Sequence, residues 1–72
     1  MYTIRIFDVN RYKLQELTTA ATSIAAAIRA ARRATKKNIF ALFYCLTDGN
    51  GNIIVKECPA RNWIEFQTDR NF

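Results

Sequence analysis

Apolar residues fall at every second position along the first segment of the chain. In YTIRIFDV, Tyr2, Ile4 and Ile6 would lie on one side of an extended strand. Alternation of this kind is typical of a strand with one buried face, so we predict a strand over residues 2–9. A turn follows at residues 10–11, and the chain then returns as a weaker strand. That return strand is predicted over residues 12–18.

A helical pattern follows. Residues 24–37 are rich in alanine and contain neither glycine nor proline, which strongly favours a helix. Thr22 or Ser23 is a suitable N-cap, and Asn38 is predicted to end the helix. The apolar and small residues fall at helical spacing on one stripe: Ile24, Ala27, Ile28, Ala31 and Thr35. Because these side chains are mostly small, the helix is expected to lie close against a sheet.

The last third of the chain predicts three strands. Residues 39–46 are almost unbroken apolar sequence, typical of a central strand. The segment DGNG at 48–51 predicts a tight turn and a return strand over 53–57, which Pro59 ends. A short closing strand is predicted over 63–67. The aromatic residues expected in the core are Phe40, Phe43, Tyr44 and Phe66.

These elements predict one small domain spanning residues 1–72. The expected class is α+β, with the order β-β-α-β-β-β. An antiparallel sheet of four to five strands would carry one amphipathic helix on one face. A chain this short has little core to spare for a substrate cleft. The face of the sheet without the helix is left for solvent or for a partner.

The net charge of +5 is confined to the helix. No acidic residue occurs between Glu16 and Asp48, yet five of the 11 basic residues lie there, and the other six balance the six acidic residues. At about 100° per residue, the five cations span an arc of about 140° opposite the apolar stripe. They are Arg29, Arg32, Arg33, Lys36 and Lys37.

This arrangement has two interpretations. One is a solvated face that maintains solubility, which Lys36 and Lys37 partly support because cations stabilise a helix C-terminus. The other is a contact surface for an anionic partner: nucleic acid, a nucleoprotein or an acidic protein. Like charges three and four residues apart each destabilise a helix by about 0.2–0.5 kcal/mol. A purely cationic face therefore favours the contact surface.

Two aromatic residues and one cation are further candidates for this contact. Tyr44 and Trp63 could stack on bases or contact a protein if they lie on the open face of the sheet. Arg61 would lie close to Trp63 in the chain. The alternative is that both aromatic side chains belong to the core.

The sequence argues against catalysis, cofactors and metals. It contains no histidine and a single serine, Ser23, whose role as an N-cap is sufficient explanation. No nucleophile, base and oxyanion site can be assembled from the scattered carboxylates. Cys45 and Cys58 have no metal-site spacing and are expected to be reduced packing residues, with Cys45 opposite Ile54 and Cys58 opposite Ala41.

The pattern predicts neither a signal peptide nor a membrane span, since no apolar run approaches about 18 residues. We therefore expect a cytoplasmic protein without a membrane partner, present as a monomer or a dimer.

Four segments in order, TIRIFDVN, SIAAAIRAARRATKKN, IFALFYCLTDGNGNIIVKE and RNWIEFQ, resemble the layout of a phage protein family. The chain resembles the small anti-CRISPR proteins that inhibit type I-F surveillance complexes. The resemblance places the family's closing element at residues 61–64. It implies an inhibitor that sits on the backbone subunits of the complex and blocks pairing of target DNA with guide RNA. The basic charge departs from mimicry of DNA and favours occlusion or contact with RNA instead.

Three functions follow as hypotheses. The first is a non-catalytic, phage-type inhibitor that binds a host nucleoprotein complex through the basic helix face and blocks its nucleic-acid target binding. The second is a DNA- or RNA-binding protein without sequence specificity, which contacts nucleic acid directly. The third is a small structural or assembly module that dimerises through an exposed strand edge.

Overall fold

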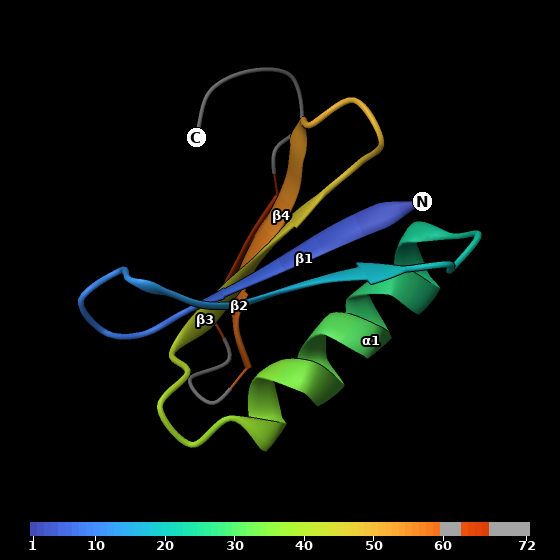
Figure 1. Cartoon of the computed structure of the whole chain (residues 1–72). Helices are drawn as coiled ribbons and strands as arrows, with labels where there is room; N and C mark the ends of the chain where they lie inside the picture. Colours follow the sequence, from blue (N-terminus) through green and yellow to red (C-terminus); the bar gives the residue numbers. More distant parts are fainter. Residues whose placement is uncertain (60–62, 67–72) are drawn as a thin grey trace.

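A computed structural model describes residues 1–59 and the backbone of 63–66. It contains one helix and five strands (Figure 1). In chain order they are β1 (Tyr2–Phe7), β2 (Lys13–Thr19), α1 (Ile24–Lys37), β3 (Phe43–Thr47), β4 (Ile53–Cys58) and β5 (Trp63–Phe66). The predicted α+β class and the predicted order of elements are confirmed.

All five strands form one antiparallel sheet in the order β2-β1-β3-β4-β5. The chain leaves β2 at one edge, passes through α1 and returns as β3 on the other side of β1. Figure 1 shows the helix running along one face of the sheet. Local sequence patterns predicted the strands, but their order across the sheet depends on this crossover.

The core lies between α1 and the centre of the sheet. Its buried members come from three strands and the helix: Ile4, Ile6, Tyr44, Leu46, Val55, Ala27 and Ala31. Two alanines at the contact allow the helix axis to approach the strands closely. The predicted stripe is buried at Ala27, Ala31 and Thr35, whereas Ile24, at the start of the helix, is 44% exposed.

The helix begins where its capping chemistry predicts. The Oγ of Ser23 accepts a hydrogen bond from the backbone N–H of Ala26 at 3.1 Å, so Ser23 is the N-cap and Thr22 is not. Asn38 ends the helix, and its backbone N–H donates to the carbonyl of Thr35. Both ends of α1 therefore satisfy backbone groups that would otherwise lack a partner.

The segment after the helix differs from the prediction. Strand β3 begins at Phe43 and not at residue 39, and Ile39 and Phe40 are 87% and 72% exposed. The Oδ1 of Asn38 accepts the backbone N–H of Phe40 at 3.0 Å, which closes a turn directly after the helix. The chain needs this turn to reverse from the helix to the sheet. The prediction that Phe40 belongs to the core is therefore wrong.

The β3–β4 hairpin forms around the predicted turn, but its register differs. Cys45 lies opposite Lys56, two residues beyond the expected Ile54, and Cys58 pairs with β5. The carboxylate of Asp48 accepts the backbone N–H groups of Asn50 and Asn52, both at 2.9 Å. A register shift between residues 46 and 47 adds to the change.

Both cysteines are buried and free. Burial raises the pKa of the Cys45 thiol above its ordinary value, which favours the protonated form. These observations agree with the predicted role of Cys45 and Cys58 as packing residues.

The face of the sheet opposite α1 carries an aromatic pair. Phe7 and Phe43 are cross-strand neighbours whose rings stack with centroids 5.0 Å apart. The ammonium of Lys56 lies 5.9 Å from the centroid of the Phe43 ring. Beside them, Glu16 accepts hydrogen bonds from Arg5 at 3.1 Å and Lys13 at 2.8 Å. One carboxylate on this face therefore partly compensates the charge of two cations.

Candidate functional site

The predicted cationic side of the helix exists, with one exception. Five cations are exposed on α1, and four of them form no salt bridge within residues 1–59. We call these four the cationic helix face: Arg29, Arg33, Lys36 and Lys37. The small residues of the same helix pack against the sheet, so the two sides of α1 differ completely in chemistry.

Arg32 is the exception. Its Nε donates to both carboxylate oxygens of Glu57, at 2.8 and 3.0 Å. Glu57 belongs to β4, and its side chain is only 8% exposed, whereas that of Arg32 is 44% exposed. The charge of Arg32 is therefore paired within the fold, and its role in the contact surface stays a prediction.

Tyr44, on β3, is the third member of the same cluster. Its hydroxyl donates to Oε1 of Glu57 at 2.6 Å, and its side chain is fully buried on the helix side of β3. A side chain in this position cannot stack on a base or contact a partner, so the prediction that Tyr44 is a contact residue is wrong. The Arg32–Glu57–Tyr44 cluster instead ties α1 to two neighbouring strands.

The pKa shifts in the cluster follow from this geometry. Burial tends to raise the pKa of the Glu57 carboxyl, but the hydrogen bonds from Arg32 and Tyr44 outweigh it and hold that pKa below its ordinary value. Burial, and then the hydrogen bond to Glu57, raise the pKa of Tyr44 well above its ordinary value. Glu57 is therefore an anion and Tyr44 a neutral donor near pH 7.

Sequence reasoning missed Glu57. The available signals were a tyrosine hydroxyl inside an apolar run, which needs a partner when buried, and an acidic residue in a strand that follows a cationic helix. Neither signal says which cation would pair with the carboxylate. That choice depends on the register of β4 against β3, which places Glu57 opposite Tyr44.

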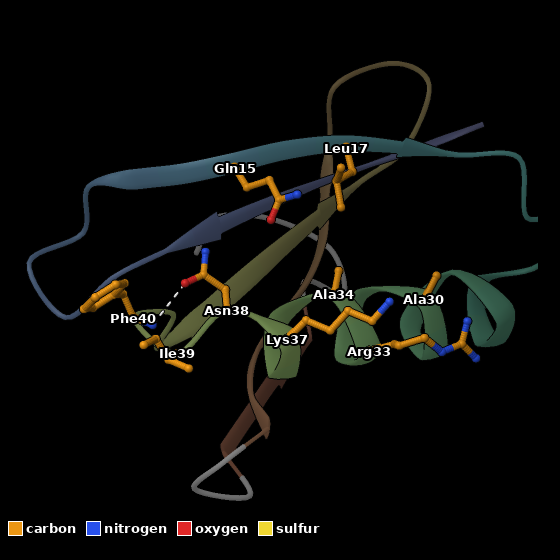
Figure 2. Close-up of a pocket in the computed structure, with 9 residues that line it drawn as sticks. All are labelled: Gln15, Leu17, Ala30, Arg33, Ala34, Lys37, Asn38, Ile39 and Phe40. Atoms are coloured by element: carbon orange, nitrogen blue, oxygen red, sulfur yellow. Dashed lines mark hydrogen bonds between the residues drawn. The ribbon is translucent and has the colours of Figure 1, made fainter.

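A groove runs between β2 and the C-terminal half of α1, and we call it the β2–α1 groove (Figure 2). Its volume is about 530 Å³. Its lining residues come from β2, from α1 and from the turn after the helix: Gln15, Leu17, Ala30, Arg33, Ala34, Lys37, Asn38, Ile39 and Phe40. In Figure 2, the side chains of Gln15 and Leu17 point from β2 toward the helix.

The groove divides the cationic helix face. Arg33 and Lys37 line the groove, whereas Arg29 and Lys36 do not. Lys36 lies on the other flank of the helix, in a smaller depression of about 240 Å³ beside Thr35 and Pro59. All four cations are thus exposed, but two of them line the β2–α1 groove and Lys36 lies on the opposite flank of the helix. The groove itself combines two cations with a short apolar lining.

Two further predicted contact residues lie at the limit of what the structure describes. Arg61 falls outside the described residues. The backbone of Trp63 pairs with Cys58 at the start of β5, but its side chain also falls outside them. The proposed roles of Arg61 and Trp63 remain predictions.

The described part of the chain holds no group of three or more side chains able to bind a metal ion. It also contains no helix long and apolar enough to cross a membrane. Comparison of the chain with protein families, with characterised proteins and with solved structures finds no match. Any function must therefore be argued from the surface of the molecule.

Proposed function

We propose that the protein is a non-catalytic inhibitor that binds a host nucleoprotein complex through its cationic helix face and obstructs that complex's binding to nucleic acid. The observation that carries this proposal is the set of four exposed helix cations, which form no salt bridge within residues 1–59. The resemblance to inhibitors of type I-F surveillance complexes supplies the class of partner.

Electrostatic cost within the free protein supports this proposal. Arg33 lies four residues from both Arg29 and Lys37, and three from Lys36. Each like-charge pair at this spacing destabilises a helix by about 0.2–0.5 kcal/mol, so the three pairs together cost roughly 0.6–1.5 kcal/mol before screening. An anionic partner would relieve this repulsion, and the relief would add to the affinity.

The rigidity of the helix supports it as well. Two hydrogen bonds from the Nε of Arg32 to Glu57 link α1 to β4, and a third, from Tyr44 on β3, holds the Glu57 carboxylate in place. The cations of the cationic helix face therefore project from a helix whose position is already set. Preorganisation of this kind reduces the entropy lost when a partner binds.

The test uses a purified type I-F surveillance complex loaded with guide RNA. Saturating protein should block the binding of target DNA in a mobility-shift assay. Two charge-reversal doubles, Arg29→Glu with Lys36→Glu and Arg33→Glu with Lys37→Glu, should each weaken inhibition by about five- to tenfold, or roughly 1 kcal/mol.

The matched control reverses two exposed cations away from the helix. Arg11→Glu with Lys13→Glu changes the net charge by the same amount, and it replaces the exposed pair between Lys13 and Glu16 by two like charges. Inhibition by this control should stay within about twofold of wild type. The proposal is refuted if the complex is not bound at all, or if all three doubles inhibit alike.

Direct binding of nucleic acid is the second candidate, and the same four cations favour it. About four phosphate contacts give an expected slope of log K against log salt near −2.8 for single strands and −3.6 for duplex. A mobility-shift titration with free DNA and RNA measures that slope. Absence of any complex at low salt excludes this function and leaves the inhibitor proposal untouched.

A further inference from the structure

Strand β2 is an edge strand, and it is the wall of the β2–α1 groove opposite the helix. Among the strands of residues 1–59 and 63–66, it pairs only with β1. It is seven residues long, contains no proline and is largely exposed. Alternate backbone N–H and C=O groups of such a strand point away from the sheet and are available to another extended chain.

The edge also lacks much of the usual protection. Its irregularity is confined to one end, where the register with β1 skips Leu14. From Gln15 to Thr19 the pairing with β1 is regular. Natural edge strands that must stay unpaired are commonly bulged, shortened or covered along their length. Here five consecutive residues remain suitable for pairing.

Charge determines which kind of chain could use this edge. Arg33 and Lys37 line the groove beside β2, where the helix-facing side chains of an added strand would lie. Cross-strand neighbours share a face of the sheet, so residues placed opposite Gln15 and Leu17 would point into the groove. Acidic side chains at those positions would meet the two cations.

The same cations disfavour two other occupants. A second copy of the chain pairing edge to edge would bring its own Arg33 and Lys37 close to this pair, and each copy carries a net charge of +5. A nucleic acid could use the cations, but it cannot pair with the backbone groups of β2. An acidic polypeptide uses both features.

We infer that the β2–α1 groove binds an extended acidic segment of a protein partner, which adds to the sheet as a sixth strand beside β2. The inference rests on the proposed function, because Arg33 and Lys37 belong to the cationic helix face. It specifies that the part of the partner bound in the groove is protein and not nucleic acid. Every second residue of the segment is acidic and contacts Arg33 or Lys37. The backbone of the segment pairs with residues 15–19.

The turn after the helix closes one end of this site. Ile39 and Phe40 line the groove there and are both highly exposed. An apolar side chain near one end of the bound segment would cover them. A partner sequence is therefore expected to alternate acidic with β-forming residues and to carry an apolar residue at one end.

The experiment uses a seven-residue peptide, acetylated and amidated, in which glutamate and threonine alternate, to match the length of β2. Fluorescence anisotropy should give a Kd below about 1 mM, and the lysine analogue should not bind. Amide hydrogen exchange should slow at alternate residues of β2.

Two variants of the peptide test the pairing itself. One is N-methylated at every glutamate and the other at every threonine, so the two have the same charge and nearly the same composition. In a paired strand only one alternate set of amides faces β2. One variant should therefore bind at least about tenfold more weakly than the other.

Two variants of the protein test the place of binding. Arg33→Glu with Lys37→Glu should weaken peptide binding at least about tenfold, whereas Arg29→Glu with Lys36→Glu, the same change in charge outside the groove, should alter it less than about threefold. Because the peptide assay needs no nucleoprotein complex, a failure here leaves the inhibitor proposal standing.

Three results would overturn the inference. The first is no saturable binding of the peptide at about 10 mM, or equal binding of the two N-methylated forms. The second is displacement of the peptide by an octathymidylate that binds tighter and depends on Arg33 and Lys37, which would assign the groove to nucleic acid. The third is a dimer in sedimentation equilibrium with slowed exchange at β2, which would assign the edge to a second copy.

Discussion

Replacement of Glu57 by glutamine tests whether the buried cluster holds the helix on the sheet. Glutamine has nearly the same shape as glutamate but carries no charge. It also presents an NH₂ group to Arg32 or Tyr44, both of which donate to Glu57 in the native protein. In either orientation of the amide, Arg32 loses one of its two acceptor oxygens, and the hydrogen bonds that remain have a neutral acceptor.

The expected cost can be worked from the individual contacts. A hydrogen bond to a charged group contributes about 1.5–3 kcal/mol when it is buried, which applies to the 2.6 Å bond from Tyr44. The side chain of Arg32 is 44% exposed, so its pair with Glu57 is screened and contributes at most about 1 kcal/mol. Glutamine also avoids the free-energy cost of keeping a charged carboxylate buried, which offsets part of the loss. We expect a net loss of about 2 kcal/mol in the free energy of unfolding.

Thermal and urea denaturation followed by circular dichroism measure this loss. For a domain of this size, 2 kcal/mol corresponds to a fall in Tm of about 8–16 °C. Arg32→Ala should also destabilise the protein. Arg33→Ala, which removes a neighbouring cation with no salt bridge within residues 1–59, should not lower the Tm and should raise it slightly, because it also removes three like-charge pairs.

The pH dependence gives a second readout. The pKa of Glu57 is lowered from 4.5 in the folded protein, so its ionised form favours folding. The difference in stability between wild type and Glu57→Gln should be constant from about pH 6 to 8 and should shrink as pH falls below about 4.5. The pKa values of Glu16 and Asp48 are also lowered, but these residues remain in both proteins and cancel in the difference. A loss below about 0.5 kcal/mol, or a difference that stays constant at low pH, would refute the role of the cluster.

Three further changes test the packing and the ends of the helix. Ser23→Ala removes the N-cap acceptor and should cost about 1 kcal/mol in urea denaturation, with Ser23→Asp restoring it; equal stability of all three proteins would contradict the capping role. Ala31→Leu places a large side chain where α1 meets the sheet and should cost about 1–3 kcal/mol in the free energy of unfolding. Ala25→Leu, on the exposed side of the helix, should change it by less than about 0.5 kcal/mol. Similar effects at the two positions would show that the helix does not pack as described. Phe40→Ser should leave the Tm within about 2 °C of wild type, because the ring is 72% exposed, and a large fall would restore Phe40 to the core.

Local patterns were sufficient for the elements of this fold. Alternation predicted β1, and the alanine-rich segment predicted α1 with both of its ends, with Thr22 and Ser23 as the two candidates for the N-cap. Each depends on interactions within a few residues, which is why the sequence alone could predict them. The limits of β3 were less accessible, since Ile39 and Phe40 have the composition of a strand but form the turn that brings the chain back from the helix.

In the candidate site, too, local sequence patterns predicted some features and the tertiary structure decided the others. The sequence determined that the excess positive charge lies on one side of one helix, because helical geometry converts spacing directly into direction. Only the tertiary structure decided that Arg32 is neutralised by Glu57, that Tyr44 lies beneath the helix, and that Arg33 and Lys37 line a groove. Those outcomes depend on strand register and on where the helix crosses the sheet. Both are set by contacts between residues far apart in the chain, which no local pattern encodes.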